Sequence, residues 1–432
     1  MSSRGPVISL IRASVPLFLS MVTGLAGTLV VTSVLGRHAT VTLAAFAVMT
    51  AVLNPAATAI AGALRGLAPF VAPHRDDPDA VVPILRDARW LSLAVGAAGA
   101  LAVLCVPGLA RTAGVPGEVV AELGALPWLI ALYLLVLASG GGATAVLVAI
   151  ERTRGVLWSS LAGTAAMIGL AVALVPPLGL TGVGVAWLLS GVASVAVANL
   201  SLRRALGRGV GRARPRIGEI IRLARVSVPL ASTILIKFGV LGVVTFAAGT
   251  TSARDAAAHA VLTTLTGFTM LASLSVAQAS VPRVARAGTT AEARRANRTA
   301  ALLAVTGTSA AALALLALGD PMLTVFSDDP GVRDRVSGLM PLMLLASTAD
   351  AAQAVQGIGL TALKRSGASL LYFATGYGLL VLAAVPVAAT WGITGLWVAM
   401  VAANVLLAVL QGAGFRRHSA RVGRPGPVTV GA

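Results

Sequence analysis

The amino-acid sequence predicts an all-α membrane protein with twelve transmembrane helices in two six-helix lobes, related by an internal pseudo-twofold repeat. Three observations lead to this prediction. The composition is strongly apolar, long uncharged runs recur along the chain, and landmarks of the first half return in the second half at one constant spacing.

The composition excludes an ordinary soluble domain. Of 432 residues, 57% are hydrophobic and 11% are charged, against roughly 45–50% and about 25% in soluble proteins. Uncharged runs such as 17–35, 128–150 and 370–390 approach or exceed the ~20 residues that a helix needs to cross about 30 Å of hydrocarbon. A transmembrane β-barrel is excluded, because barrel strands alternate apolar and polar side chains whereas these runs are apolar throughout.

The positions of charges, prolines and glycines divide the chain into individual spans. The first apolar stretch is too long for a signal peptide and no small-residue cleavage site follows it, so we interpret it as an uncleaved first span. We expect spans near residues 9–35, 40–73, 88–109, 120–150, 155–176, 179–202, 220–248, 256–284, 299–319, 336–363, 366–390 and 392–415.

The net charge of +18 first suggests nucleic acid, but the basic residues lie between the expected spans. The side that holds both termini carries 26 of the 33 Lys and Arg residues and the opposite side carries 5, with Arg65 and Lys237 left inside spans. Basic loops face the cytoplasm, so we expect both termini there and a location in the cell (inner) membrane. Nucleic acid is not needed as a partner.

The two halves match at a constant offset of 213 positions. Ser14-Val15-Pro16-Leu17 returns as Ser227-Val228-Pro229-Leu230, and Gly179-Leu180-Thr181-Gly182 returns as Gly392-Ile393-Thr394-Gly395. Six spans per copy give both copies the same orientation, which places the repeat axis along the membrane normal. We expect an N-terminal lobe over residues 1–205, a cytoplasmic linker over 206–217 and a C-terminal lobe over 218–432 with a short basic tail.

One acid of the 15 in the chain lies in the middle of a span, and this is Asp350. An acid at the bilayer centre costs roughly 2.5–3.5 kcal/mol, so it should face a cavity or a partner. Lys237 in the seventh span is the natural partner, since helix rise places both groups about 18–21 Å from the cytoplasmic face. The pair is either a structural ion pair between two helices or a site whose protonation changes during transport.

Three amides are further candidates for a substrate cavity, namely Gln353, Gln356 and Asn54. Each of them serves equally well as an interhelical hydrogen-bonding residue, which is common between spans. The four histidines show no metal-ligand spacing, and no glycine-rich phosphate loop ends in Gly-Lys-Ser or Gly-Lys-Thr. We therefore expect no metal, no cofactor, no catalytic residue and no enzyme activity.

Several motifs of the sequence resemble those of the MATE (multidrug and toxic compound extrusion) family, within the superfamily that also contains oligosaccharidyl-lipid and polysaccharide exporters. The similarity covers about residues 8–415. It rests on Gly36-Arg37 with Leu43-Ala44-Ala45, on Pro229 with Ala258-His259-Ala260-Val261, on Asp350-Ala351-Ala352-Gln353 with Leu363-Lys364-Arg365-Ser366-Gly367, and on the repeated Gly179 and Gly392 motifs. The resemblance implies two six-helix lobes and an antiporter that exports small amphipathic organic compounds, such as drugs or natural products.

Asp350 matches the acid that the NorM-like branch carries in its tenth span for cation coupling. Two positions depart from the family pattern: Val31 replaces an acid of the first span, and Lys237 replaces an acid of the seventh. A tethered ammonium already neutralises Asp350, so we expect coupling to H⁺, or of the substrate to the pair directly, rather than to Na⁺. We expect a monomer in the lipid bilayer with a small-molecule substrate. The alternatives are a flippase for a lipid-linked or polysaccharide precursor and a non-transporting membrane component.

Overall fold

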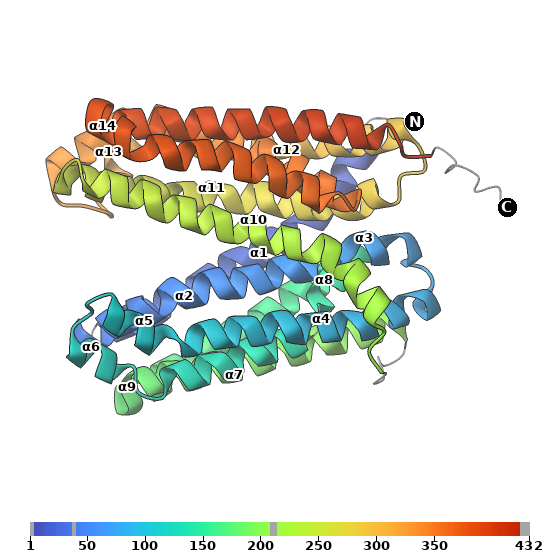
Figure 1. The fold of residues 1–432 in the computed structure, drawn as a ribbon, viewed down its shortest axis with the longest axis horizontal. Helices are drawn as coiled ribbons and strands as arrows, with labels where there is room; N and C mark the ends of the chain where they lie inside the picture. The colour runs from blue at the N-terminus through green and yellow to red at the C-terminus, as the bar shows by residue number, and fades with distance from the viewer. Residues whose placement is uncertain (1–3, 37–39, 141, 208–213, 424–432) are drawn as a thin grey trace. The chain divides into compact units, whose positions relative to one another are not determined.

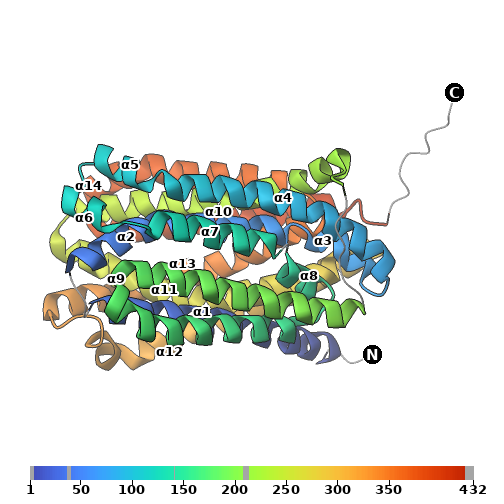
Figure 2. The same cartoon turned by 90° about the horizontal axis from the view of Figure 1, so that it is seen from below.

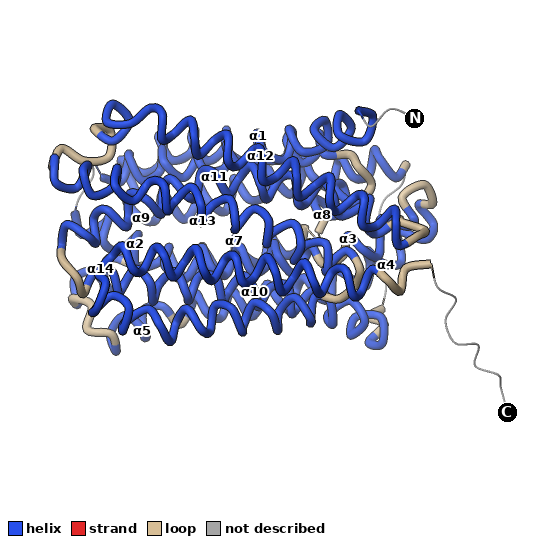
Figure 3. Tube along the Cα trace, turned by 90° about the horizontal axis from the view of Figure 1, so that it is seen from above, coloured by secondary structure: helices blue, strands red, loops and turns tan. Residues whose placement is uncertain are grey.

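The computed structural model describes residues 4–36, 40–140, 142–207 and 214–423. Within these residues the chain is helical with short turns and contains no strand, which confirms the all-α prediction (Figure 3). Arg37 of the first-lobe motif, Gly141 and residues 208–213 of the expected linker lie outside the described residues.

The first copy of the repeat contains long helices and several short ones (Figure 1). In order they are α1 (Arg4–Gly36), α2 (Thr40–Arg65), α3 (Ala68–Val71), the 3₁₀ helix η1 (Ala72–His74), α4 (Pro78–Leu104), α5 (Val106–Thr112), α6 (Gly117–Glu122), α7 (Leu126–Ser139), α8 (Ala143–Ala149) and α9 (Thr153–Leu206). The second copy consists of α10 (Ile217–Gly249), α11 (Ala253–Ala285), α12 (Thr290–Leu323), α13 (Pro330–Ala362) and α14 (Ser366–Ser419).

Helix boundaries repeat at the offset that the sequence shows. Both bounds of α10 follow those of α1 at an offset of 213 (217 − 4 and 249 − 36), and both bounds of α14 follow those of α9 at the same offset (366 − 153 and 419 − 206). Both α1 and α10 also carry a proline inside the helix, Pro16 and Pro229. The duplication is therefore present in the backbone as well as in the sequence.

Two helices are too long to be single spans. Both α9 and α14 have 54 residues, which corresponds to about 80 Å at 1.5 Å per residue. Each is interrupted by a non-helical glycine, Gly179 (φ 53°, ψ −130°) and Gly392 (φ 60°, ψ −154°). Over the described ranges ten helices are long and apolar enough to cross a membrane. With α9 and α14 divided at their glycines, they supply the twelve predicted spans of a multi-pass membrane protein.

The copies differ in the fourth span of each. In the first copy this span is divided into α7 and α8 around Gly142, whose φ of 69° lies in the left-handed region. In the second copy the equivalent helix α13 is continuous, and Gln353 and Val355 occupy the positions that correspond to Gly140 and Gly142 (353 − 140 and 355 − 142). A glycine adopts a left-handed backbone without strain, whereas a β-branched residue does not, so the local sequence explains the difference.

Capping residues define several helix starts. The side chain of Asp77 accepts hydrogen bonds from the backbone nitrogens of Asp79 (3.0 Å) and Ala80 (3.2 Å) before α4. Ser252 caps α11 and Asp329 caps α13 in the same way. These residues satisfy backbone N–H groups that have no partner within the helix, which stabilises each start.

The described chain forms two compact units. One comprises the described residues of Val15–Leu235, called here the N-terminal unit, and the other comprises those of Ile236–Ala432 together with those of Met1–Ser14, called here the C-terminal unit. In the N-terminal unit α7 packs against α4 and α9, and in the C-terminal unit α13 packs against α11, α12 and α14 (Figures 1 and 2). The lobe boundaries expected from the sequence, at 205 and 218, stay a prediction.

Candidate functional site

The central polar contact of the C-terminal unit joins Lys237 of α10 to Asp350 of α13. The Nζ atom of Lys237 lies 2.7 Å from Oδ1 of Asp350. The Asp350 side chain is 7% exposed and the Lys237 side chain is 25% exposed, so the ammonium is the more accessible member. Two charges in such a sheltered place are compatible with folding only because each neutralises the other.

Two further side chains contact this pair directly. Gln353, one turn along α13, donates a hydrogen bond from Nε2 to Oδ1 of Asp350 at 3.0 Å. The Sδ atom of Met270 on α11 lies 3.6 Å from Nζ of Lys237. Both donors to Asp350 therefore bind Oδ1, and no described residue donates a hydrogen bond to Oδ2. The three helices α10, α11 and α13 together hold the site.

A second polar contact links α13 to α14 close to the pair. The hydroxyl of Tyr377 donates to Oδ1 of Asn404 at 3.0 Å. The Nδ2 atom of Asn404 donates to the carbonyl oxygen of Ala346, one turn before Asp350, at 3.3 Å. Tyr377 and Asn404 are both buried, at 5% and 6% exposure. The sequence gives no signal for either residue, because neither carries charge and Tyr and Asn are common between helices.

The remaining two predicted residues do not join the pair. Gln356 accepts a hydrogen bond at Oε1 from Nδ2 of Asn297 on α12 at 2.7 Å, which is the interhelical role left open by the sequence. Asn54 is exposed on α2 and lies in the N-terminal unit, whereas the other four candidates lie in the C-terminal unit. The structure thus brings together three of the five predicted residues.

The first copy of the repeat carries no such site. The positions equivalent to Lys237, Asp350 and Gln353 are Gly24, Leu137 and Gly140, each at the same offset of 213 (237 − 24, 350 − 137 and 353 − 140). None of these three residues has a charged side chain or a side-chain amide. All three members of the site therefore depart from the repeat, which can be read from the sequence without coordinates.

A buried histidine also departs from the repeat. Nε2 of His259 lies 3.3 Å from Oγ1 of Thr245 and 3.4 Å from Oγ1 of Thr263, and its ring lies 5.8 Å from that of Trp397. The equivalent position in the first copy is Phe46 (259 − 46 is 213). Among the described residues no group of three or more His, Cys, Asp or Glu is placed to hold a metal ion.

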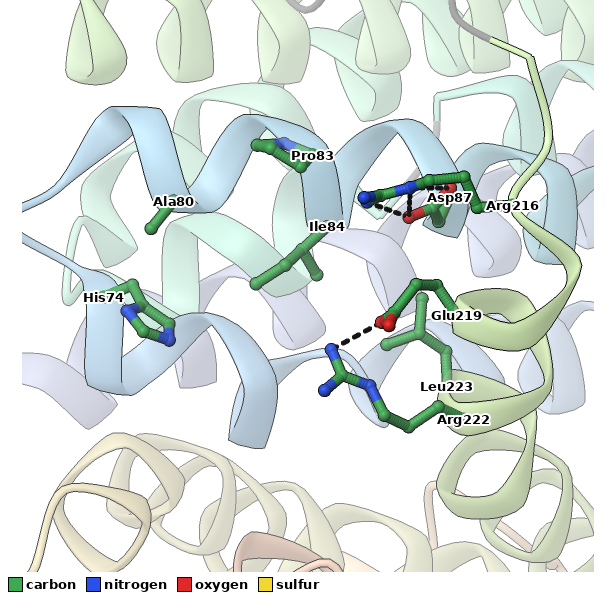
Figure 4. Close-up of a pocket in the computed structure, with 9 residues that line it drawn as sticks. All are labelled: His74, Ala80, Pro83, Ile84, Asp87, Arg216, Glu219, Arg222 and Leu223. Carbon is green, nitrogen blue, oxygen red and sulfur yellow. Dashed lines mark hydrogen bonds and ion pairs between the residues drawn. The ribbon is translucent and has the colours of Figure 1, made fainter.

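The N-terminal unit contains a pocket of about 240 Å³ where α10 begins (Figure 4). Asp87 of α4 is 3% exposed and binds the guanidinium of Arg216, which directly precedes α10, at 2.5 Å. This hydrogen bond raises the pKa of Arg216 above its ordinary value. On the same rim Glu219 pairs with Arg222 at 2.6 Å. Asp87 thus neutralises Arg216 and joins the residue before α10 to α4, and Glu219 neutralises Arg222.

Known proteins and a family model resemble this chain. The MatE family model matches residues 229–387, a segment that contains both Lys237 and Asp350. The probable multidrug resistance protein NorM of Aromatoleum aromaticum is 27% identical over 425 residues, covering 88% of each chain. The protein of the same name from Xanthomonas axonopodis pv. citri is 26% identical over 429 residues, covering 95% of this chain and 93% of the relative.

The fold has close counterparts among solved structures. One is the outward-facing conformation of a multidrug resistance MATE family transporter of the MOP superfamily, with a TM-score of 0.87, 16% sequence identity and 96% of each chain covered. Structural similarity at this level of sequence identity supports the fold alone. The family model and the NorM relatives add similarity in sequence. Members of this family are transporters, not enzymes. This chain, with its duplicated helical bundle, is similar to the MATE family of membrane transporters, in sequence to the family model over residues 229–387 and in fold over nearly its whole length.

Proposed function

We propose that this protein is a secondary active antiporter that exports small amphipathic organic compounds, drugs or natural products, in exchange for H⁺. Its place is the cell (inner) membrane with both termini in the cytoplasm, as the 26-to-5 distribution of basic residues favours. The relatives named as probable multidrug resistance proteins support the substrate class. The single observation behind the coupling ion is the Lys237–Asp350 pair.

A purely structural role for the pair is the less favoured alternative. The first copy builds its spans with Gly24 and Leu137 at the equivalent positions, so the helical unit does not require charges there. Replacing a buried ion pair by apolar residues of similar size is commonly neutral or stabilising. Charged side chains inside a membrane cost free energy, and those that the fold does not require usually take part in function. We therefore favour a role of this pair in transport.

Protonation changes the net charge of the site from zero to one positive charge. A neutral Asp350 no longer holds the ammonium of Lys237, so the bond between α10 and α13 weakens. Proton binding therefore acts directly on the contact between two helices. Such a contact has two states, closed when Asp350 is ionised and released when it is neutral, and the proton gradient biases the balance between them.

Sodium fits this site less well than a proton. Na⁺ beside Asp350 would place a second cation near Nζ of Lys237, which lies 2.7 Å from the carboxylate. Two cations sharing one carboxylate leave an uncompensated charge in a medium of low dielectric constant. A proton leaves the same net charge, but it binds covalently to a carboxylate oxygen, so no second ion with its own coordination shell has to fit beside Nζ of Lys237.

Gradient-driven efflux from proteoliposomes tests the proposal. Asp350→Asn keeps the shape of the side chain and removes its proton chemistry, so we expect efflux driven by a pH gradient to stop while the protein stays folded. The matched control is Asp334→Asn, the same change at an exposed acid of α13 about 24 Å away along the helix, which should transport normally. Unchanged pH-driven efflux by Asp350→Asn, or efflux that follows a sodium gradient alone, would refute proton coupling at this site.

A further inference from the structure

The Lys237–Asp350 pair has unused hydrogen-bonding capacity on both of its members. Lys237 Nζ carries three N–H donors, and one of them reaches Asp350. It also contacts the sulfur of Met270 at 3.6 Å, and a thioether is a weak acceptor. On the acid, Lys237 and Gln353 both bind Oδ1, which leaves Oδ2 without a donor among the described residues. The site thus offers one strong donor and one strong acceptor at the same place.

The net charge of the pair decides which solutes can use these groups. A cation that approaches Oδ2 also approaches the ammonium of Lys237, and an anion that approaches Nζ also approaches Asp350. Either solute leaves the sheltered site with one unbalanced charge. A solute that carries one ammonium and one carboxylate leaves the net charge at zero and makes two charge-assisted hydrogen bonds.

We propose that the Lys237–Asp350 pair is a recognition site for zwitterionic solutes, whose carboxylate binds Nζ of Lys237 and whose ammonium binds Oδ2 of Asp350. Gln353 acts as a positioning residue, because its hydrogen bond to Oδ1 keeps Oδ2 free for the ligand. The ligand carboxylate takes the place of Met270 beside Nζ. The inference rests on the proposed function only in making this ligand the exported substrate, since binding itself needs no gradient.

The same carboxylate of Asp350 also accounts for the exchange of the ligand against a proton. A proton on Asp350 competes with the ammonium of the ligand for the carboxylate. Protonation therefore expels the ligand, and ligand binding expels the proton. The pair acts as a site that holds either a zwitterion or a proton at Asp350, but not both.

Three fluorescent probes that share one dansyl group separate the charge classes. Nε-dansyl-lysine is a zwitterion, dansylcadaverine lacks only its carboxylate, and dansylaminohexanoate lacks only its α-ammonium. Each would be titrated against the purified full chain in nanodiscs without any ion gradient, with the increase in dansyl fluorescence as the readout. Loss of one charge-assisted hydrogen bond should weaken binding about 10- to 100-fold, so we expect dansyl-lysine to bind tightest.

Two variants should change the order of affinities in opposite directions. Lys237→Gln leaves a site with one negative charge, which should bind dansylcadaverine tightest. Asp350→Asn leaves a site with one positive charge, which should bind dansylaminohexanoate tightest. The control Asp334→Asn removes an exposed acid from the same helix and should keep the preference for dansyl-lysine.

Affinities measured on the unmodified protein are enough to refute the proposal, so the test does not depend on whether a variant folds. Equal affinities for the three probes, tighter binding of dansylcadaverine, or no measurable binding of dansyl-lysine would each refute it. An unchanged order of affinities in folded Lys237→Gln and Asp350→Asn would also refute it. These results are independent of the efflux assay, so a transporter driven by another ion could still show the zwitterion preference.

Discussion

Gly392 adopts the same non-helical backbone as Gly179, its counterpart in the first copy of the repeat. Their φ angles are 60° and 53°, and their ψ angles are −154° and −130°. This region of backbone space is essentially restricted to glycine. The two residues thus mark the same turn between two spans in both copies, and both copies need a residue without a side chain there.

Gly392→Ala should destabilise the protein through the backbone alone. A Cβ at this position would meet no atom within 4 Å, so no clash contributes. The strained conformation costs about 1–3 kcal/mol, and the apparent Tm measured by scanning fluorimetry should fall. Gly378→Ala in the same helix also has open space around its Cβ, but its helical backbone favours alanine by about 1 kcal/mol, so its Tm should not fall. Equal Tm values for the two variants would contradict this view of Gly392.

Gly359→Ala should destabilise the protein through packing. A Cβ there would lie 2.5 Å from Oδ1 of Asn297 and 3.1 Å from the ring of Phe415. The forced shift would also disturb the 2.7 Å hydrogen bond from Asn297 to Gln356. We expect a loss of about 1–3 kcal/mol, seen as a lower Tm. The matched control is Gly338→Ala, an exposed position of the same helix with nothing within 4 Å, which should keep or raise the Tm.

The Asp87–Arg216 pair should respond unequally to loss of either member. Arg216→Gln strands a carboxylate that is 3% exposed, whereas Asp87→Asn leaves a guanidinium that is 57% exposed and can bind water. We therefore expect Arg216→Gln to lower the Tm more than Asp87→Asn does. The double variant should recover part of the stability lost in Arg216→Gln. Additive effects in this double-mutant cycle, measured by thermal unfolding, would mean that the two side chains do not interact.

The Lys237–Asp350 pair should prove dispensable for folding. Lys237→Met alone leaves a charged Asp350 that is 7% exposed, so a marked loss of stability is expected. Adding Asp350→Leu removes the stranded charge and copies Leu137 of the first copy. The double variant should regain roughly 0.5–3 kcal/mol relative to the sum of the single variants.

Transport measured on the same double variant separates structure from function. We expect a folded protein whose efflux no longer responds to a pH gradient. A double variant that unfolds as readily as Lys237→Met would support a structural ion pair instead. Full pH-driven efflux by the folded double variant would show that neither residue takes part in coupling.

Much of the fold follows from local properties of the sequence. Apolar length alone predicts a span, because a helix must satisfy its own backbone hydrogen bonds in lipid. The constant spacing of 213 predicts the duplication, and the matching bounds of α1 with α10 and of α9 with α14 confirm it. The breaks are less readily predicted, since Gly142 and Gly179 adopt positive φ angles whereas most other glycines of the described segments are helical.

The candidate site could be predicted only in part. An acid and a lysine inside spans are conspicuous because each is costly there, so Asp350 and Lys237 are found without coordinates. Amides carry no such signal. Gln353 and Gln356 lie three residues apart on α13, yet one binds Asp350 and the other binds Asn297 on α12. Which neighbour each amide meets depends on how α13 packs, not on its own sequence.

The sequence by itself determined the helical class, the number of spans and the duplication, because hydrophobic length and repeat spacing are properties of the chain read in order. The tertiary structure alone decided that Lys237 and Asp350 lie 2.7 Å apart, that both donors bind the same carboxylate oxygen, and that buried Asp87 holds Arg216. The Lys237–Asp350 and Asp87–Arg216 contacts join residues separated by more than a hundred positions. Their geometry arises from the packing of whole helices against one another, which no local pattern encodes.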